Sequence, residues 1–173
     1  MLEEVLRTLS KCKSIDDIVI VSKDNAAIKL GEPFGTTQIL DEDLGVNQAV
    51  HLADQYLSDL ECNCSIIFPQ DIPMMESSDV DSLLGFLKSK NSVILVPSRQ
   101  FNGTNALVRY YASSMKTQYD KGSYSYQLDS AKSVTQNVSL ALIRRIMLDI
   151  DDEYDLTVSY THLRAHETRE DRG

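Results

Sequence analysis

Two aspartates, Asp71 and Asp149, each follow an apolar run that predicts a β-strand. Ligands of open α/β sheets bind at strand ends, and the cations that bridge phosphates prefer carboxylate oxygens. Asp71 also lies between Pro69 and Pro73, which restrict the backbone of its loop. Asp151 alternates with Asp149 along an extended segment, so only one of those two can face such a site. Together the carboxylates predict a divalent metal and phosphate site, although each alone could be a turn residue that caps backbone N–H groups.

Hydrogen-bond donors follow or precede other predicted elements. Gly103, Thr104 and Asn105 follow an apolar strand and predict either a phosphate-binding turn or a plain tight turn between strands. Ser123 begins a predicted helix, where the positive helix end suits an anion and where a serine also serves as a cap. Asn47 likewise opens a helix and could bind a base edge or merely cap it.

The elements that must position these residues alternate between helix and strand. Apolar residues at helical spacing predict helices, and short continuous apolar runs predict buried strands. The alternation predicts an α/β fold with a doubly wound, mostly parallel sheet. The helices are expected at 2–12, 46–60, 77–87 and 123–132, and the strands at 18–21, 38–40, 64–68, 92–96, 106–111 and 138–146, with loop between 22 and 37.

Composition narrows the class of protein. The chain has 173 residues with a net charge of −9 and no basic stripe, which argues against nucleic acid as a partner. It has no long apolar run that would span a membrane and an acidic N-terminus unlike a signal peptide, so we expect a cytoplasmic protein. Its three cysteines are expected to be reduced thiols. An acidic protein can still bind a nucleotide if a metal ion supplies positive charge.

The C-terminal end differs in character from the rest. Residues 159–173 have no apolar periodicity, and the stretch 160–168 resembles a translated sequencing-library adapter. We therefore expect one domain over 1–158 and a disordered, non-native tail after it. His162 and His166 have the spacing of a metal pair, but we do not assign them a metal.

Taken in order, these segments resemble the 2-phospho-L-lactate guanylyltransferase family (CofC), which serves coenzyme F-420 biosynthesis. The resemblance implies a nucleotidyltransferase fold like that of nucleotide-diphospho-sugar transferases and molybdenum-cofactor guanylyltransferases. The segments that carry it are Gly45–Ala49, Gln70–Pro73, Val96–Arg99, Gly103–Leu107, Tyr119–Tyr124 and Leu148–Asp151.

The resemblance also implies substrates and roles. GTP would be the nucleotide donor, 2-phospho-L-lactate or phosphoenolpyruvate the acceptor, and Mg²⁺ the cofactor, with pyrophosphate released. The implied roles are metal binding and catalysis for Asp71 and Asp149, acceptor binding for Thr104, Asn105, Asp120 and Ser123, and nucleotide binding for Gly45 and Asn47.

One departure from the family concerns the N-terminal end. The family begins with a strand and a loop that grips the triphosphate, whereas this chain opens on a predicted helix. We therefore expect a sheet without its first strand, an N-terminally truncated copy and negligible transfer activity. A relative with another nucleotide or acceptor, and a non-catalytic binding fragment, stay open as alternatives, as does a homodimer.

Overall fold

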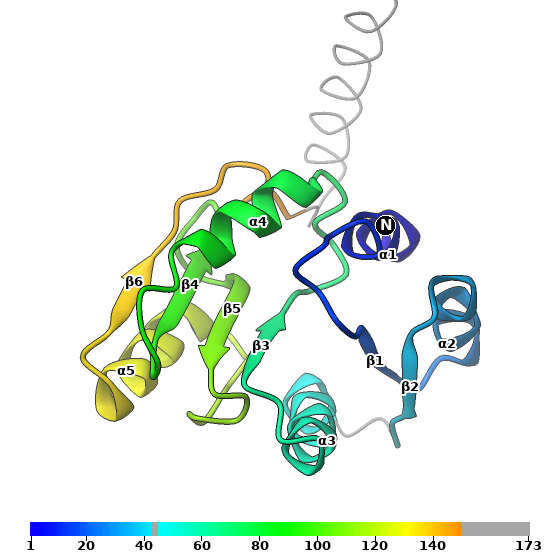
Figure 1. Cartoon of the computed structure of the whole chain (residues 1–173), viewed down its shortest axis with the longest axis horizontal. Coiled ribbons are helices and arrows are strands. Elements are labelled where there is room, and N and C mark those ends of the chain that lie inside the picture. Colours follow the sequence, from blue (N-terminus) through cyan, green and yellow to red (C-terminus); the bar gives the residue numbers. More distant parts are fainter. Residues whose placement is uncertain (43–44, 150–173) are drawn as a thin grey trace, which may run out of the picture.

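The computed structural model describes residues 1–42 and 45–149, and these form an α/β arrangement of two sheets with helices packed around them (Figure 1). The α/β class predicted from the alternation of apolar patterns is thereby confirmed. The elements are α1 (Leu2–Leu9), β1 (Val19–Ser22), α2 (Asn25–Gly31), the 3₁₀ helix η1 (Glu32–Phe34), β2 (Thr37–Leu40), α3 (Val46–Asp59), β3 (Cys64–Ile67), α4 (Ser77–Gly85), β4 (Val93–Pro97), β5 (Thr104–Tyr110), α5 (Ser123–Val134) and β6 (Val138–Leu140). No helix in the described ranges is long and apolar enough to cross a membrane.

The smaller sheet consists of β1 and β2, which pair in parallel with Val19 opposite Thr37. The crossover between them contains α2, a helix that the sequence interpretation placed in a loop. Its start is marked by Asp24, whose side chain accepts a hydrogen bond from the backbone N–H of Ala26 at 2.8 Å. Asp24 as an N-cap residue indicates a helix start in the sequence. A loop was predicted instead because Gly31 and the residues after it are typical of one.

The larger sheet has the strand order β3-β5-β4-β6. β4 and β6 are parallel, whereas β5 is antiparallel to both β3 and β4. The connection 98–103 between β4 and β5 is too short for the crossover of about a dozen residues that parallel strands need. The sheet is therefore mixed, and β6 ends at Leu140, well before the predicted end of the last strand.

The predicted Gly-Thr-Asn turn needs correction. Only Gly103 lies in the connection, while Thr104 and Asn105 are the first residues of β5 and are both buried. Because β5 runs antiparallel, its beginning lies at the same edge of the sheet as the end of β4, opposite Pro97. The residues predicted to bind a ligand thus still lie at the edge where β4 ends.

Within the described residues, no hydrogen bonds between strands join the two sheets. Among the described residues, β1 pairs only with β2, and β3 pairs only with β5. In the view of Figure 1 the small sheet lies to one side of β3. The sequence predicted one continuous sheet, whereas the described strands form two. That the fold lacks the first strand of its family stays a prediction.

Apolar side chains cover both faces of the larger sheet, as expected for central strands. On one face Ile94 and Val96 of β4 pack in a cluster with Val80 and Leu83 of α4. On the other face Leu95 packs in a cluster with Ala131 of α5. The sheet is therefore held between α4 and α5, and this fixes the start of α5 relative to β5.

Candidate functional site

Asn47, the second residue of α3, joins that helix to the segment before α5. Its Oδ1 accepts a hydrogen bond from the backbone N–H of Tyr119 at 2.7 Å. Its Nδ2 donates to Asp120 Oδ2 at 3.2 Å, and Gln118 Nε2 donates to the same carboxylate oxygen at 3.3 Å. A residue predicted on the nucleotide side and one predicted on the acceptor side are therefore in direct contact.

Gly45 is the N-cap residue of α3 and has a φ of 89°, a conformation that favours glycine. An added Cβ would meet nothing within 4 Å, so the demand for glycine here is conformational and not steric. Gly45 itself has no side chain that could cap α3, and none of the described residues caps it either. Backbone N–H groups at this positive end of the helix suit an anion.

Thr104 and Ser123 meet at the start of β5 and of α5. Ser123 Oγ donates a hydrogen bond to Thr104 Oγ1 at 3.4 Å, and each residue is only 5% exposed. The residue before Ser123, Gly122, is a left-handed N-cap with a φ of 79° and no capping side chain. Two predicted acceptor residues are thereby brought together at a helix N-terminus, three positions after Asp120 in the sequence.

Asn105 lies elsewhere. Successive residues of a strand point to opposite faces, so it is turned away from Thr104. Its Nδ2 donates to the backbone carbonyl of Ile146 at 2.9 Å in the protein interior. Arg145 binds the Asp79 carboxylate of α4 through Nε at 2.7 Å and Nη2 at 2.8 Å. Asn105 and Arg145 thus anchor the segment that leads to Asp149.

Asp71 lies in the loop between β3 and α4, beside the fully buried Ile72, and Asp149 is at the end of the second described range. Asp151 falls outside the described residues. Within the described ranges there is no group of three or more His, Cys, Asp or Glu side chains that could hold a metal ion. A site shared by Asp71 and Asp149 would hold only two protein carboxylates, and it stays a prediction.

The connection 98–103 is closed by hydrogen bonds that the sequence did not reveal. Ser98 Oγ donates to Asn102 Oδ1 at 2.7 Å and accepts from the backbone N–H of Gly103 at 3.0 Å. This connection presents Phe101, whose ring packs edge-on against Tyr124 of α5 with centroids 5.6 Å apart. Both aromatic residues are visible in the sequence, but nothing in their spacing indicates that they meet.

A buried ion pair joins β5 to α3. Arg109 of β5 is 0% exposed and binds both carboxylate oxygens of Asp54 in α3, at 2.9 and 2.5 Å. Its Nε also donates to Ser65 Oγ at 3.2 Å. Nearby, burial raises the pKa of the Tyr119 phenol, so this group stays neutral. Arg109 is visible in the sequence as a charge beside the apolar residues of β5, but nothing in the sequence pairs it with Asp54.

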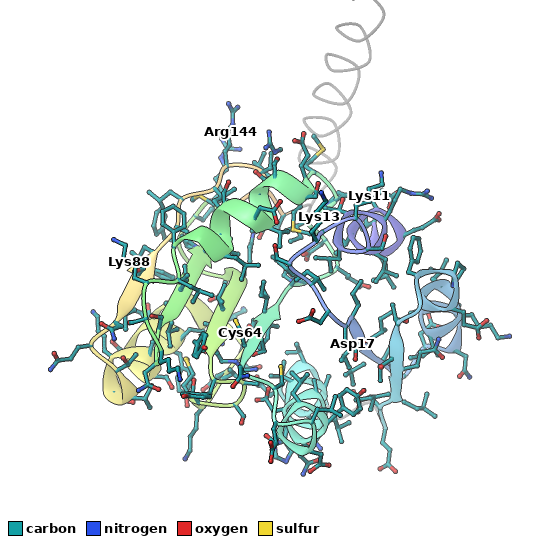
Figure 2. The ribbon with its side chains drawn as sticks, viewed as in Figure 1. Lys11, Lys13, Asp17, Cys64, Lys88 and Arg144 are labelled. Carbon is teal, nitrogen blue, oxygen red and sulfur yellow. The ribbon has the colours of Figure 1, made fainter. Side chains whose placement is uncertain are left out.

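Four of the cationic side chains lie far from this cluster. In the view of Figure 2, Lys11 and Lys13 lie by α1, Arg144 lies beyond α4 and Lys88 lies at the left near β6, each away from α3. These four therefore do not supply positive charge at the start of α3.

The fold is of the nucleotide-diphospho-sugar transferase-like class. The structure is similar to a 4-diphosphocytidyl-2C-methyl-D-erythritol synthase of Anaerococcus prevotii, with a TM-score of 0.69 and 12% identity over 94% of this chain and 85% of that one. It is also similar to a proposed nucleotide-diphospho-sugar transferase of Desulfovibrio desulfuricans G20, with a TM-score of 0.70 and 16% identity over 91% and 70%. At these identities the similarity shows the fold.

Sequence comparison defines the family. Residues 1–171 match the family described as "Guanylyl transferase CofC like", and the chain belongs to it. It is 27% identical to a phosphoenolpyruvate guanylyltransferase of Conexibacter woesei, over 90% of this chain and 71% of that protein. It is 28% identical to a 2-phospho-L-lactate guanylyltransferase of a Methanocaldococcus species, strain FS406-22, over 94% and 70%. The family inferred from the sequence motifs is thereby confirmed.

Proposed function

We propose that this protein transfers the guanylyl group of GTP to phosphoenolpyruvate or 2-phospho-L-lactate and releases pyrophosphate. The relatives named for these two acceptors support the reaction class. The observation that carries the proposal is two hydrogen-bonded pairs, Asn47 with Asp120 and Ser123 with Thr104, in which Asp120 and Ser123 lie three positions apart in the chain. The proposal also includes GTP as the donor and Mg²⁺ as the cofactor. It further includes a role in coenzyme F-420 biosynthesis, a cytoplasmic location and a homodimer.

In the proposed reaction a phosphate oxygen of the acceptor attacks the α-phosphorus of GTP. The bond from that phosphorus to the α–β bridging oxygen breaks, and pyrophosphate leaves with the electron pair. The product is an enolpyruvyl- or lactyl-diphosphoguanosine. The protein contributes positioning and hydrogen bonds to charged oxygens.

The acceptor carries a phosphate and a carboxylate, and both need donors. We assign them to the hydroxyls of Thr104 and Ser123 and to the backbone N–H groups at the start of α5. Asn47 holds Asp120 and Tyr119 in place beside these groups. Asn47 therefore acts on the acceptor side as well as on the nucleotide side to which the sequence assigned it.

Asp71 and Asp149 are the candidate ligands of Mg²⁺. Mg²⁺ is commonly bound by one or two carboxylates together with substrate phosphates, so two aspartates form a suitable donor set without a third protein ligand. When bound, the ion neutralises charge on the phosphate oxygens. The segment that leads to Asp149 is fixed by the Asn105 and Arg145 contacts.

A second candidate is a protein that binds the acceptor without turnover. The separation of the two sheets favours it, because β1 and β3 do not pair with each other in the described residues. One experiment distinguishes the two candidates: the purified chain is incubated with GTP, Mg²⁺ and each acceptor, and products are followed by ³¹P NMR. Acceptor binding is measured separately by calorimetry.

Formation of pyrophosphate and a diphosphoguanosine product supports guanylyl transfer. Acceptor binding without product supports the second candidate. A chain that neither binds an acceptor nor forms product contradicts both candidates.

A further inference from the structure

We propose that Phe101 and Tyr124 form an apolar wall of the acceptor site that selects phosphorylated acids with a methyl or methylene third carbon over those with a hydroxymethyl group. This inference rests on the proposed function, because it concerns the same acceptor. It adds a discriminating element that the predicted site residues do not include. Two contacts join the β4–β5 connection and the start of β5 to α5.

Both contacts join the start of β5 and its preceding connection to the start of α5. One is the buried hydrogen bond from Ser123 to Thr104. The other is the edge-to-face contact of the Phe101 and Tyr124 rings, with an interplanar angle of 84°. Since Tyr124 follows Ser123 directly and Phe101 precedes Thr104 by three positions, the aromatic pair lies beside the hydroxyl pair.

The two contacts differ in exposure. Thr104 and Ser123 are each 5% exposed, whereas Phe101 is 45% exposed and Tyr124 is partly buried. A small acid whose phosphate is held at the hydroxyls must extend from the interior toward solvent. In the proposed arrangement that outward path runs along the aromatic pair.

The connection that carries Phe101 is held in one shape before any ligand binds. The backbone N–H of Phe101 donates to the Ser98 carbonyl at 3.0 Å, and Ser98 N–H donates to the Gly103 carbonyl at 2.9 Å. Ser98 Oγ bridges Asn102 and Gly103. A preorganised wall loses little freedom on binding and can therefore discriminate between similar ligands.

The chemistry of the rings sets the direction of selectivity. The third carbon of phosphoenolpyruvate is a methylene group and that of 2-phospho-L-lactate a methyl group, and both are apolar. 2-Phosphoglycerate carries a hydroxymethyl group at the same position. Placing that hydroxyl against aromatic carbon without a hydrogen bond is unfavourable, and an apolar pocket discriminates against an added hydroxyl by up to about 100-fold.

The test is calorimetric titration of the full chain with phosphoenolpyruvate, 2-phospho-L-lactate and 2-phosphoglycerate, with and without a non-hydrolysable GTP analogue. We expect the wild type to bind the first two about 10- to 100-fold more tightly than 2-phosphoglycerate. Phe101→Ala should reduce that ratio about tenfold, and Phe101→Leu, which keeps an apolar side chain, should retain most of it. Tyr124→Phe should leave the ratio unchanged, because it retains the ring.

Tyr126→Ala is the matched control, since Tyr126 is a partly exposed tyrosine of the same helix outside the pair. An unchanged ratio in Phe101→Ala, in a variant with a native circular dichroism spectrum, overturns the aromatic wall and leaves the proposed function standing. Loss of selectivity in Tyr124→Phe also overturns it, because the phenol hydroxyl and not the ring would then discriminate. Absence of binding by all three acids to the wild type contradicts the proposed function itself.

Discussion

The side chains of Asn47 and Asp120 are hydrogen-bonded at 3.2 Å, although they lie on different elements far apart in the sequence. The same Asn47 amide accepts the backbone N–H of Tyr119 at 2.7 Å. One residue at the start of α3 thus fixes the segment that leads into α5. The proposed acceptor site depends on that geometry.

Asn47→Ala removes both hydrogen bonds to the 119–120 segment. We expect acceptor affinity to fall about tenfold, since a hydrogen bond with a charged partner contributes about 1.5–3 kcal/mol and part of this is recovered by water. Asn47→Asp should cost more, because it faces Asp120 with a like charge. Calorimetry measures both variants, and Gln38→Ala on the exposed face of β2 is the control. Unchanged affinity in Asn47→Asp would contradict the role of this contact.

Ser123→Ala and Thr104→Ala remove the paired hydroxyls at the start of α5. In an active enzyme we expect KM for the acceptor to rise about 10- to 150-fold while KM for GTP changes little, because each loses a hydrogen bond to a charged group. Steady-state kinetics with each substrate varied in turn gives the two values. If only KM for GTP rises, these residues lie on the nucleotide side and the acceptor assignment is wrong.

Asp54→Ala leaves the fully buried Arg109 guanidinium without its carboxylate partner. We expect the free energy of unfolding to fall by about 3–5 kcal/mol, since an unpaired buried charge is strongly unfavourable. Urea denaturation followed by circular dichroism measures the change. Asp59→Ala, at an exposed position of the same helix, should change it by less than about 0.5 kcal/mol. Equal effects of the two substitutions would show that the ion pair does not stabilise the fold.

Cys64, labelled in Figure 2, tests the burial of β3. Burial disfavours the thiolate and raises the pKa of the Cys64 thiol from 9.0 to about 11. Because the thiolate is the reactive form, we expect alkylation of Cys64 by iodoacetamide to be slow at pH 8 and to rise up to about pH 11. Mass spectrometry of the labelled peptides gives the rate against pH. In urea the same rise should occur near the ordinary pKa, and a folded-state rise at that lower pH would contradict the burial.

Much of the fold could be predicted because the buried strands are continuous apolar runs. The runs that became β3 and β4 were located within a residue or two, and Ser77 and Ser123 correctly marked helix starts. The direction of β5 was missed because the interpretation assumed crossovers, whereas the 98–103 connection is too short for one. The short helix α2 was missed because Gly31 and its neighbours outweighed the Asp24 cap.

The sequence identified which residues belong to the candidate site, but it did not reveal which of them contact one another. Thr104 and Ser123 were assigned to one ligand and do meet, whereas Asn105 was assigned with them and instead binds the Ile146 carbonyl. That difference follows from the alternation of a strand, which became visible only once Thr104 was known to lie in β5. The Arg109–Asp54 pair depends on tertiary packing, for which the sequence carries no local signal.

We propose that Thr104, Asp120 and Ser123 form the binding site of a three-carbon phosphorylated acid. Titration of the ¹⁵N-labelled chain with phosphoenolpyruvate or 2-phospho-L-lactate, followed by NMR of the backbone amides, tests it most directly. We predict that the largest shifts occur at residues 119–125 and at 103–105, and that they disappear in the Ser123→Ala, Thr104→Ala double variant. Shifts confined to other parts of the chain, or unchanged by the double variant, would contradict the account.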